Sequence, residues 1–289
     1  MSRLALGTVQ FGIPYGIANK AGQVTRASVK NMLQLAAANS IDTLDTAMAY
    51  GESENCLGEI GVKEFRVVTK LPAISDASID ISAWSQRQLN EALARLDETS
   101  VYGLLLHSTS QLKGKNGEAL YKALQDLKAS GQVQKIGISI YSPNELDELF
   151  SYYDFDLVQA PFNLLDRRLA ESGWLERLKE KDVEIHVRSV FLQGLLLMEK
   201  ENIPVKFTPW NELFIQWHKW LSNNSVSAIQ ACLAYPLSFS EIDRVIVGCD
   251  SMTQLEQIIN MSQTHVSCEL PDLGCDDEKL INPSFWSQL

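Results

Sequence analysis

Long apolar runs and runs of basic residues are both missing from this chain of 289 residues. The longest apolar stretches, such as Val101–Leu106, have the length of a strand, whereas a transmembrane helix needs about 20 consecutive apolar residues. Asp and Glu number 36 against 25 Lys and Arg, giving a formal net charge of −11. Because nucleic acids are bound through a surplus of basic side chains, we expect neither a nucleic-acid partner nor a membrane.

Cysteine pairs of the CxxC type are also absent. The five cysteines are scattered, at Cys56, Cys232, Cys249, Cys268 and Cys275. This pattern predicts no zinc site and indicates free thiols in a reducing compartment. The N-terminal sequence MSRLALGTVQFG lacks the basic segment and apolar stretch of a signal peptide. The sequence therefore predicts a cytoplasmic protein without a bound metal.

Two glycine-rich phosphate motifs are missing, since no GxGxxG follows a predicted strand and no GxxxxGK[ST] occurs. Short β-branched or leucine-rich segments instead alternate with segments of helical period. The predicted strands are Leu4–Leu6, Thr43–Asp45, Phe65–Thr69, Val101–Leu106, Lys135–Ser139, Leu157–Gln159, Glu184–Ser189 and Arg244–Val247. The predicted helices include Arg26–Asn39, Ser82–Glu98, Gly117–Ser130, Pro143–Ser151, Ala170–Lys181 and Thr253–Met261.

Strands that alternate with helices predict a parallel sheet covered by helices. Eight strands favour a closed (β/α)₈ barrel, or TIM barrel, over a doubly wound sheet, although counting alone leaves the second fold open. No linker or low-complexity segment divides the chain, so we expect residues 1–289 to form a single domain. We interpret the long interval 200–240, with a helical pattern over Val226–Tyr235, as a peripheral helical insertion with lid character.

Polar residues gather at consecutive strand ends. Asp45 ends the second strand, Tyr50 follows in the same loop, Lys70 ends the third strand and His107 ends the fourth. The carboxyl ends of barrel strands form the active-site face. A free tyrosine has a pKa of about 10, and a nearby ammonium lowers it. We therefore expect Lys70 to lower the pKa of Tyr50, Asp45 to hold Lys70, and His107 to orient a carbonyl oxygen.

The motifs around these residues resemble the aldo-keto reductase superfamily. LGTVQFG is similar to that family's first strand, LDTAMAYGESE to its segment with the catalytic Asp and Tyr, and VVTK and LLLH to its Lys and His segments. GISIYS, LVQAPFNLLDRR, VRSVFLQGLL and VIVGCDSMTQLEQI resemble later strand ends in the same order. The resemblance implies a (β/α)₈ oxidoreductase that reduces an aldehyde or ketone with NAD(P)H, using Tyr50 as general acid with Asp45, Lys70 and His107.

The same resemblance implies a cofactor that lies extended across the mouth of the barrel. Ser139 and Gln159 match the residues that bind the carboxamide, the segment from Ser189 to Gln193 matches the pyrophosphate loop, and Gly248 to Gln257 matches the adenosine end. The implied cofactor-binding residues are Gly7, Thr8, Asp45, Ser139, Gln159, Arg188, Ser189, Phe191, Gln193, Gly248, Ser251, Gln254 and Gln257.

Three residues depart from the family pattern. Ile140 stands where Asn often follows the serine, and Arg188 stands where an aromatic residue commonly stacks on the nicotinamide. Asp250 occupies the region in which basic residues usually read the 2′-phosphate. The resemblance implies NADPH as cofactor, and Asp250 leaves NADH open.

The substrate is expected to be a small or polar carbonyl compound, including sugar-derived aldehydes, because the segment after His107 is short and polar. Phe11, Tyr15, Trp84 and Phe162 are candidates for the substrate pocket, although the core is the favoured place for each. Two other functions stay open. One is a regulatory or accessory barrel that binds the cofactor with little turnover, and the other is an isomerase or lyase with Lys70 as Schiff-base nucleophile. We expect a monomer or a weak homo-oligomer.

Overall fold

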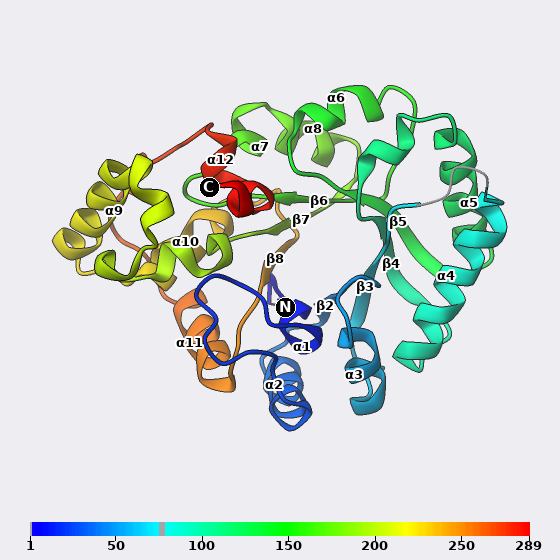
Figure 1. Cartoon of the computed structure of the whole chain (residues 1–289), viewed down its shortest axis with the longest axis horizontal. Coiled ribbons are helices and arrows are strands. Elements are labelled where there is room, and N and C mark those ends of the chain that lie inside the picture. The colour runs from blue at the N-terminus through cyan, green and yellow to red at the C-terminus, as the bar shows by residue number, and fades with distance from the viewer. Residues whose placement is uncertain (1, 75–78) are drawn as a thin grey trace.

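Eight parallel strands form a closed barrel in chain order in the computed structural model, which describes residues 2–74 and 79–289 (Figure 1). The strands are β1 (Leu4–Gly7), β2 (Thr43–Asp45), β3 (Arg66–Leu71), β4 (Val101–Leu106), β5 (Val133–Ser139), β6 (Leu157–Pro161), β7 (Glu184–Arg188) and β8 (Arg244–Val247). The predicted (β/α)₈ barrel is therefore confirmed, and the doubly wound alternative is wrong.

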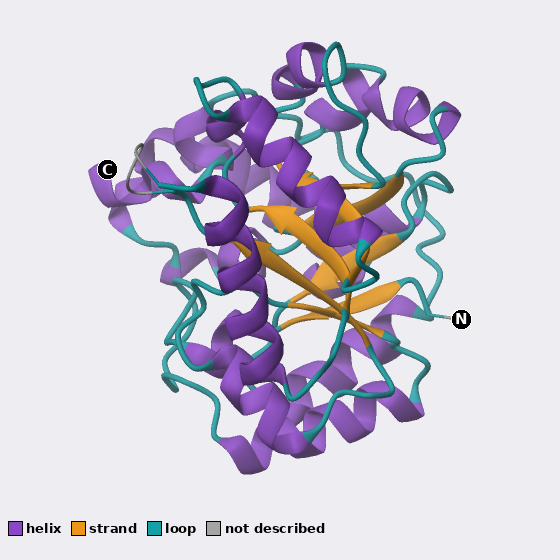
Figure 2. Ribbon diagram, turned by 90° about the vertical axis from the view of Figure 1, so that its right-hand side faces the viewer, coloured by secondary structure: helices purple, strands orange, loops and turns teal. Residues whose placement is uncertain are grey.

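Helices surround the barrel and cover its outer face (Figure 2). The α-helices are α1 (Val9–Gly12), α2 (Arg26–Ala38), α3 (Ser53–Ile60), α4 (Ile81–Leu96), α5 (Gly117–Ala129), α6 (Asn144–Leu149), α7 (Arg168–Glu171), α8 (Trp174–Glu180), α9 (Asn211–Asn224), α10 (Ala228–Leu237), α11 (Met252–Ser262) and α12 (Glu278–Ile281). The 3₁₀ helices are η1 (Thr109–Leu112), η2 (Leu192–Leu197), η3 (Lys200–Asn202), η4 (Val205–Trp210) and η5 (Pro283–Gln288). No helix in residues 2–74 or 79–289 has the length and apolarity of a membrane span.

The two ends of the sheet meet between β1 and β8, where Leu4 pairs with Val245 and Leu6 with Val247. Arg3 strengthens this closure, because its guanidinium donates hydrogen bonds to the carbonyl oxygens of Leu237 and Ile242. Apolar residues fill the layer between sheet and helices. A smaller cluster of Val68, Leu105 and Leu157 is formed by three of the strands and is separate from that layer. The barrel is thus a packed core and not a pore.

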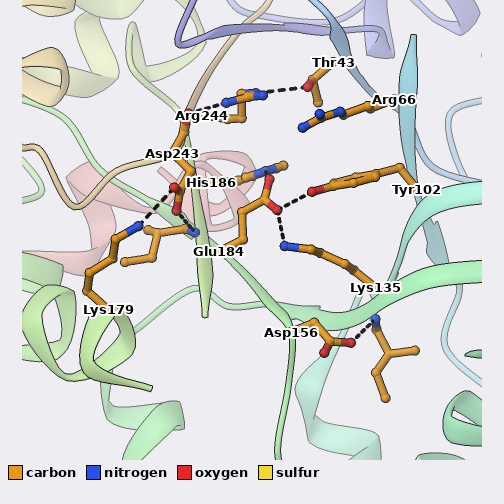
Figure 3. A network of polar contacts seen from close by, with 12 residues as sticks. Thr43, Arg66, Tyr102, Lys135, Asp156, Lys179, Glu184, His186, Asp243 and Arg244 are labelled. Atoms are coloured by element: carbon orange, nitrogen blue, oxygen red, sulfur yellow. Dashed lines mark hydrogen bonds and ion pairs between the residues drawn. The ribbon is translucent and has the colours of Figure 1, made fainter. Parts of the chain in front are cut away.

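A network of polar side chains lies where the strands begin (Figure 3). The carboxylate of Glu184 accepts hydrogen bonds from Tyr102 Oη at 2.5 Å and from Lys135 Nζ at 2.6 Å, and its other oxygen lies 2.7 Å from His186 Nε2. Burial alone would raise the pKa of Glu184, but these partners together hold it well below its usual range. The network gives the buried charge of Glu184 hydrogen-bond partners at the end of the barrel where the strands begin.

The structure corrects several details of the predicted elements. The third strand runs over Arg66–Leu71 and not Phe65–Thr69, so Lys70 lies within it. Helix α3 was not predicted, because it has only eight residues. In the interval 200–240, η4, α9 and α10 pack beside the barrel, and only Ile229 of that interval lines the cavity among the described residues. The interval is peripheral, as expected, while its lid character stays a prediction.

Candidate active site

A cavity of about 480 Å³ opens at the carboxyl ends of the strands, and all four polar residues singled out from the sequence line it. Asp45 ends β2, Lys70 is the penultimate residue of β3, and His107 follows β4 directly. Tyr50 lies in the loop between β2 and α3. The parallel topology thus brings together residues that are 62 positions apart at most, from Asp45 to His107.

Asp45 and Lys70 form a buried ion pair. Lys70 Nζ lies 2.7 and 2.8 Å from the two carboxylate oxygens and also donates to the carbonyl oxygen of Thr46 at 2.8 Å. Gln159 Nε2 donates to Asp45 Oδ1 at 2.6 Å, and Gln159 Oε1 accepts from Ser139 Oγ at 3.3 Å. Burial lowers the pKa of Lys70, and the carboxylate of Asp45 opposes that shift. Each polar atom of the pair therefore has a fixed partner.

Tyr50 lies beside this pair, with its ring centroid 5.2 Å from Lys70 Nζ. The expectation that Lys70 lowers the pKa of Tyr50 is wrong: burial raises that pKa, and the negative charge of Asp45 raises it further. The main physical reason is burial, which disfavours the charged phenolate, and Asp45 adds a negative charge next to the phenol. Tyr50 is consequently a protonated phenol at neutral pH.

His107 completes the group, and its ring meets that of Tyr50 edge to face with centroids 5.9 Å apart. Burial and the charge of Lys70 lower the pKa of His107 to about 4. The imidazole is therefore neutral at physiological pH. A neutral imidazole has one N–H donor and one acceptor nitrogen.

The Tyr50 loop is held by close backbone contact with α1. A Cβ atom added to Gly12 would lie 1.6 Å from the carbonyl oxygen of Tyr50. Gly51 has φ of +54°, and a Cβ there would lie 2.8 Å from the carbonyl oxygen of Gly12. Ser53 Oγ donates to Thr8, at 2.9 Å. Small residues at these positions allow the loop to approach α1 and fix the place of Tyr50.

The residues implied for the cofactor extend along the same cavity. Those that line it are Gly7, Thr8, Asp45, Ser139, Gln159, Arg188, Ser189, Phe191, Gln193, Gly248, Gln254 and Gln257. Ser251 does not line the cavity. Its Oγ instead accepts a hydrogen bond from Gln254 N and caps α11, which is the usual role of serine at a helix start.

The loop after β7 has an unusual backbone. Ser189, Leu192 and Gln193 have φ of +62°, +47° and +53°, and Gly194 follows with +88°. A left-handed conformation costs a non-glycine residue roughly 1–2 kcal/mol. Such strain concentrates at functional sites, and here the strained residues Ser189 and Gln193 border the cavity.

The sequence pointed to Tyr15 as a pocket residue but not to the course of its segment, residues 13–23, which crosses the cavity between the loops after β7 and β8. Tyr15 Oη accepts from Gln193 Nε2 at 3.1 Å, and Asn19 Nδ2 donates to Asp250 Oδ1 at 3.1 Å. Ala18 lies so close to Gly194 that a Cβ on that glycine would be 2.6 Å away. The segment has no periodicity, so its course depends on contacts that no local pattern encodes.

Of the four aromatic residues considered for the substrate pocket, only Tyr15 lines the cavity. Phe11 and Phe162 are fully buried and Trp84 is nearly so, and all three belong to the apolar core. The alternative that these three are core residues is confirmed. Tyr141, which was not considered, lies at the mouth and is 41% exposed.

A closed parallel barrel with this cavity defines the class of protein. The family model named "Aldo/keto reductase family" matches residues 3–269, and the chain belongs to that family. Among solved structures, aldo-keto reductase AKR11C1 from Bacillus halodurans is similar in its holo form, with a TM-score of 0.72 and 20% identity over 92% of this chain and 88% of that one. Its apo form gives a TM-score of 0.70. These likenesses confirm the fold.

A curated relative resembles part of the chain. The NADH-specific methylglyoxal reductase of Escherichia coli (strain K12) is 24% identical over 148 residues. The match spans 46% of this chain and 45% of that reductase.

Proposed function

We propose that the protein is an oxidoreductase that reduces an aldehyde or ketone to the alcohol with a nicotinamide cofactor, and that Tyr50 is its general acid. The observation that carries this proposal is the convergence of four side chains on one cavity. The Tyr50 phenol and the His107 imidazole both border the space beside the buried Asp45–Lys70 pair. Membership in the aldo/keto reductase family supports the same reaction class.

The far part of the cavity fits a dinucleotide. A Cβ on Gly248 would lie 2.7 Å from Gln10 Nε2, so a larger residue there would collide with the side chain of Gln10, which also lines the cavity. Gln10 Oε1 is buried and has no hydrogen-bond partner among the described residues. Ser139 and Gln159 would hold the nicotinamide end, the loop Ser189–Gln193 the phosphates, and Gly248 with Gln257 the adenosine end. The bound cofactor supplies the hydride.

The chain's own residues supply the proton and its setting. Because its pKa is raised, Tyr50 keeps its proton until a developing alkoxide takes it. The neutral His107 donates its N–H to the carbonyl oxygen and so places that oxygen near the phenol. Asp45 holds Lys70 beside the phenol, with Lys70 Nζ 5.2 Å from the centroid of the Tyr50 ring. The positive charge of Arg188 favours the phenolate left after transfer.

NADH is the cofactor that the cavity favours, although the family resemblance alone implies NADPH. Asp250 lines the adenosine end and holds Asn19. The cationic residues among the described lining are Lys70 and Arg188, and both belong to the Tyr50 end. A 2′-phosphate would therefore meet a carboxylate with no basic partner. The relative from Escherichia coli is named as NADH-specific, which agrees with this preference.

The Schiff-base alternative has less support. A nucleophilic lysine must reach the substrate as a free amine, whereas Lys70 is 1% exposed and its ammonium contacts both oxygens of Asp45. The regulatory alternative predicts cofactor binding without turnover, and the experiment below distinguishes it.

The test measures oxidation of NADH and NADPH with a panel of aldehydes and ketones, for the native chain and for Tyr50→Phe. We expect turnover by the native chain and a loss of about 10²–10⁴-fold in kcat for Tyr50→Phe, the usual scale for a missing general acid. Tyr152→Phe is the control, because Tyr152 is 77% exposed and far from the chemistry. Cofactor binding measured by fluorescence should survive both substitutions. Full turnover by Tyr50→Phe contradicts the role of Tyr50, and binding without any turnover identifies a regulatory barrel.

A further inference from the structure

Arg188 brings a positive charge to the cavity at the end where Tyr50 and His107 lie. It ends β7, it is partly buried, and it lines the cavity. Its Nη2 donates to the carbonyl oxygen of Ile140 at 2.9 Å, and its Nη1 lies 3.3 Å from Ser189 Oγ. The guanidinium carbon also lies 4.7 Å from the centroid of the Tyr141 ring. The side chain is therefore held in place by neutral groups.

No carboxylate among the described residues pairs with Arg188. Arg3 is also partly buried without a carboxylate partner in the described part of the chain, but it donates to backbone carbonyl oxygens at the closure of the barrel and does not line the cavity. Other partly buried arginines have a carboxylate partner. Arg95 pairs with Glu54, Arg168 with Asp166, and Arg244 with Asp42. The carboxylate of Asp45 lies at the same end of the cavity, but it already accepts hydrogen bonds from Lys70 and Gln159. A partly buried charge without a counter-ion is costly, so it is retained where a ligand supplies the opposite charge.

The charge of Arg188 acts on the reacting groups. Burial raises the pKa of Tyr50 and lowers that of His107, and in each case the positive charge of Arg188 is among the further influences. It also acts on Tyr15, whose pKa is raised mainly by burial. Such influence requires that the guanidinium be near these side chains, so a molecule in contact with Tyr50 and His107 lies within its reach.

We propose that Arg188 binds the anionic group of the carbonyl substrate, so that the enzyme acts on aldehydes or ketones that also carry a carboxylate or a phosphate. This inference rests on the proposed reductase function. A guanidinium has five N–H donors in a planar fork that matches the oxygens of either anion. Ile140 and Ser189 engage two of the nitrogens, and the remaining N–H groups are available to the substrate. Tyr141 and Tyr15 at the mouth provide hydroxyl-bearing walls for the rest of a small polar molecule.

The experiment compares matched pairs of substrates that differ in charge. Succinic semialdehyde is paired with butanal, and glyceraldehyde 3-phosphate with glyceraldehyde, for the native chain, Arg188→Gln and Arg188→Lys. We expect the native chain to prefer at least one anionic member. Arg188→Gln should lower the ratio of kcat/KM for the anionic member to kcat/KM for the neutral member by about 10–100-fold, mostly through KM. The ratio within a pair cancels any change common to both members that follows from losing a charge near Tyr50 and His107. Arg188→Lys should recover part of the loss, because it restores the charge without the fork.

Binding gives a readout independent of turnover. Saturation-transfer NMR should detect the alcohol product of the preferred anionic substrate on the native chain, 4-hydroxybutyrate for the carboxylate pair or glycerol 3-phosphate for the phosphate pair. The signal should be lost with Arg188→Gln. The carboxylate and phosphate pairs separately identify which anion is bound.

An equal loss of kcat/KM for charged and neutral members overturns the proposal. A native chain that prefers neither anionic substrate over its neutral partner overturns it as well. The proposal is also overturned if Arg188→Gln weakens the binding of NADH while the kcat/KM ratio of anionic to neutral substrate stays unchanged. Arg188 would then bind the cofactor and not the substrate. Absence of turnover with every carbonyl, neutral ones included, instead shows that the proposed function has failed.

Discussion

Lys70 Nζ contacts both carboxylate oxygens of Asp45, and the two side chains are 1% and 6% exposed. An ion pair removed from water in this way depends on both members, because either charge left alone in the barrel has no solvent to stabilise it. The pair is therefore expected to contribute to the stability of the fold, and Asp45 also raises the pKa of Tyr50.

Asp45→Asn is expected to lower the free energy of unfolding by about 3–5 kcal/mol, the range for one partner removed from a buried pair. The double variant Asp45→Asn with Lys70→Met should be more stable than Asp45→Asn alone, since no unpaired charge remains. Urea unfolding of the two single variants and the double variant measures the coupling. Additive losses in this cycle would show that the pair has no special stabilising role.

Stability should fall as the pH decreases from about 6.5 to 4, in part through His107. An unfolded histidine takes up a proton near pH 6.5, whereas the pKa of folded His107 is about 4. The unfolded state therefore binds more protons within this window, and acid favours it. His107→Gln removes this contribution, so its urea midpoint should decline less steeply over the same window. His265→Gln, at an exposed histidine, is the control and should follow the native curve.

Asp250→Asn should improve the binding of NADPH relative to NADH by roughly fivefold, since a repulsion of about 1 kcal/mol is expected for like charges 4 Å apart in water. The amide keeps the size of the side chain and leaves an oxygen for Asn19. Asp250→Lys should shift the preference further. Fluorescence titration with both cofactors measures the ratio, and Asp126→Asn, at an exposed acid on α5, is the charge-matched control. An unchanged ratio in Asp250→Lys would show that the 2′-phosphate lies elsewhere.

Gly12→Ala should reduce both stability and kcat, because the new methyl group would meet the backbone of Tyr50 at 1.6 Å. Overpacking of this kind costs about 1–3 kcal/mol. Gly114→Ala is the matched control, as its Cβ would find only the carbonyl oxygen of Gln111, at 3.7 Å. Thermal unfolding and steady-state rates of the two variants test the prediction. Native kinetics in Gly12→Ala would mean that the loop does not position Tyr50.

The sequence predicted the barrel because each strand carries its own apolar signal and each loop ends it with polar residues. It also predicted that Asp45, Lys70 and His107 share one face, since parallel strands end on the same side. It did not predict the sign of the pKa shift of Tyr50, which depends first on the burial of the phenol and then on the charge of Asp45 beside it. The burial of a side chain and the distance between two charged groups depend on the folded structure, so the spacing of residues in the sequence does not predict them.

The same limit applies to single residues. The sequence left Phe11, Trp84 and Phe162 open between the pocket and the core, and their side chains pack into the core. Ser251 was expected at the cofactor, and its hydroxyl caps the start of α11. The segment with Tyr15 and Asn19 was not foreseen as a bridge across the cavity, because its contacts, to Gln193 and Asp250, are with residues about 180 and 230 positions away.

The closure of β1 against β8 also governs when this protein can fold. Arg3 donates to the carbonyl oxygen of Ile242, a contact between residues 239 positions apart. A chain emerging from the ribosome therefore carries its first strand without one of its two neighbours until almost the whole sequence has been made. A fragment that stops before Arg244 keeps two open sheet edges, which are templates for pairing with other chains. The last strand is thus what converts an aggregation-prone open sheet into an edgeless barrel.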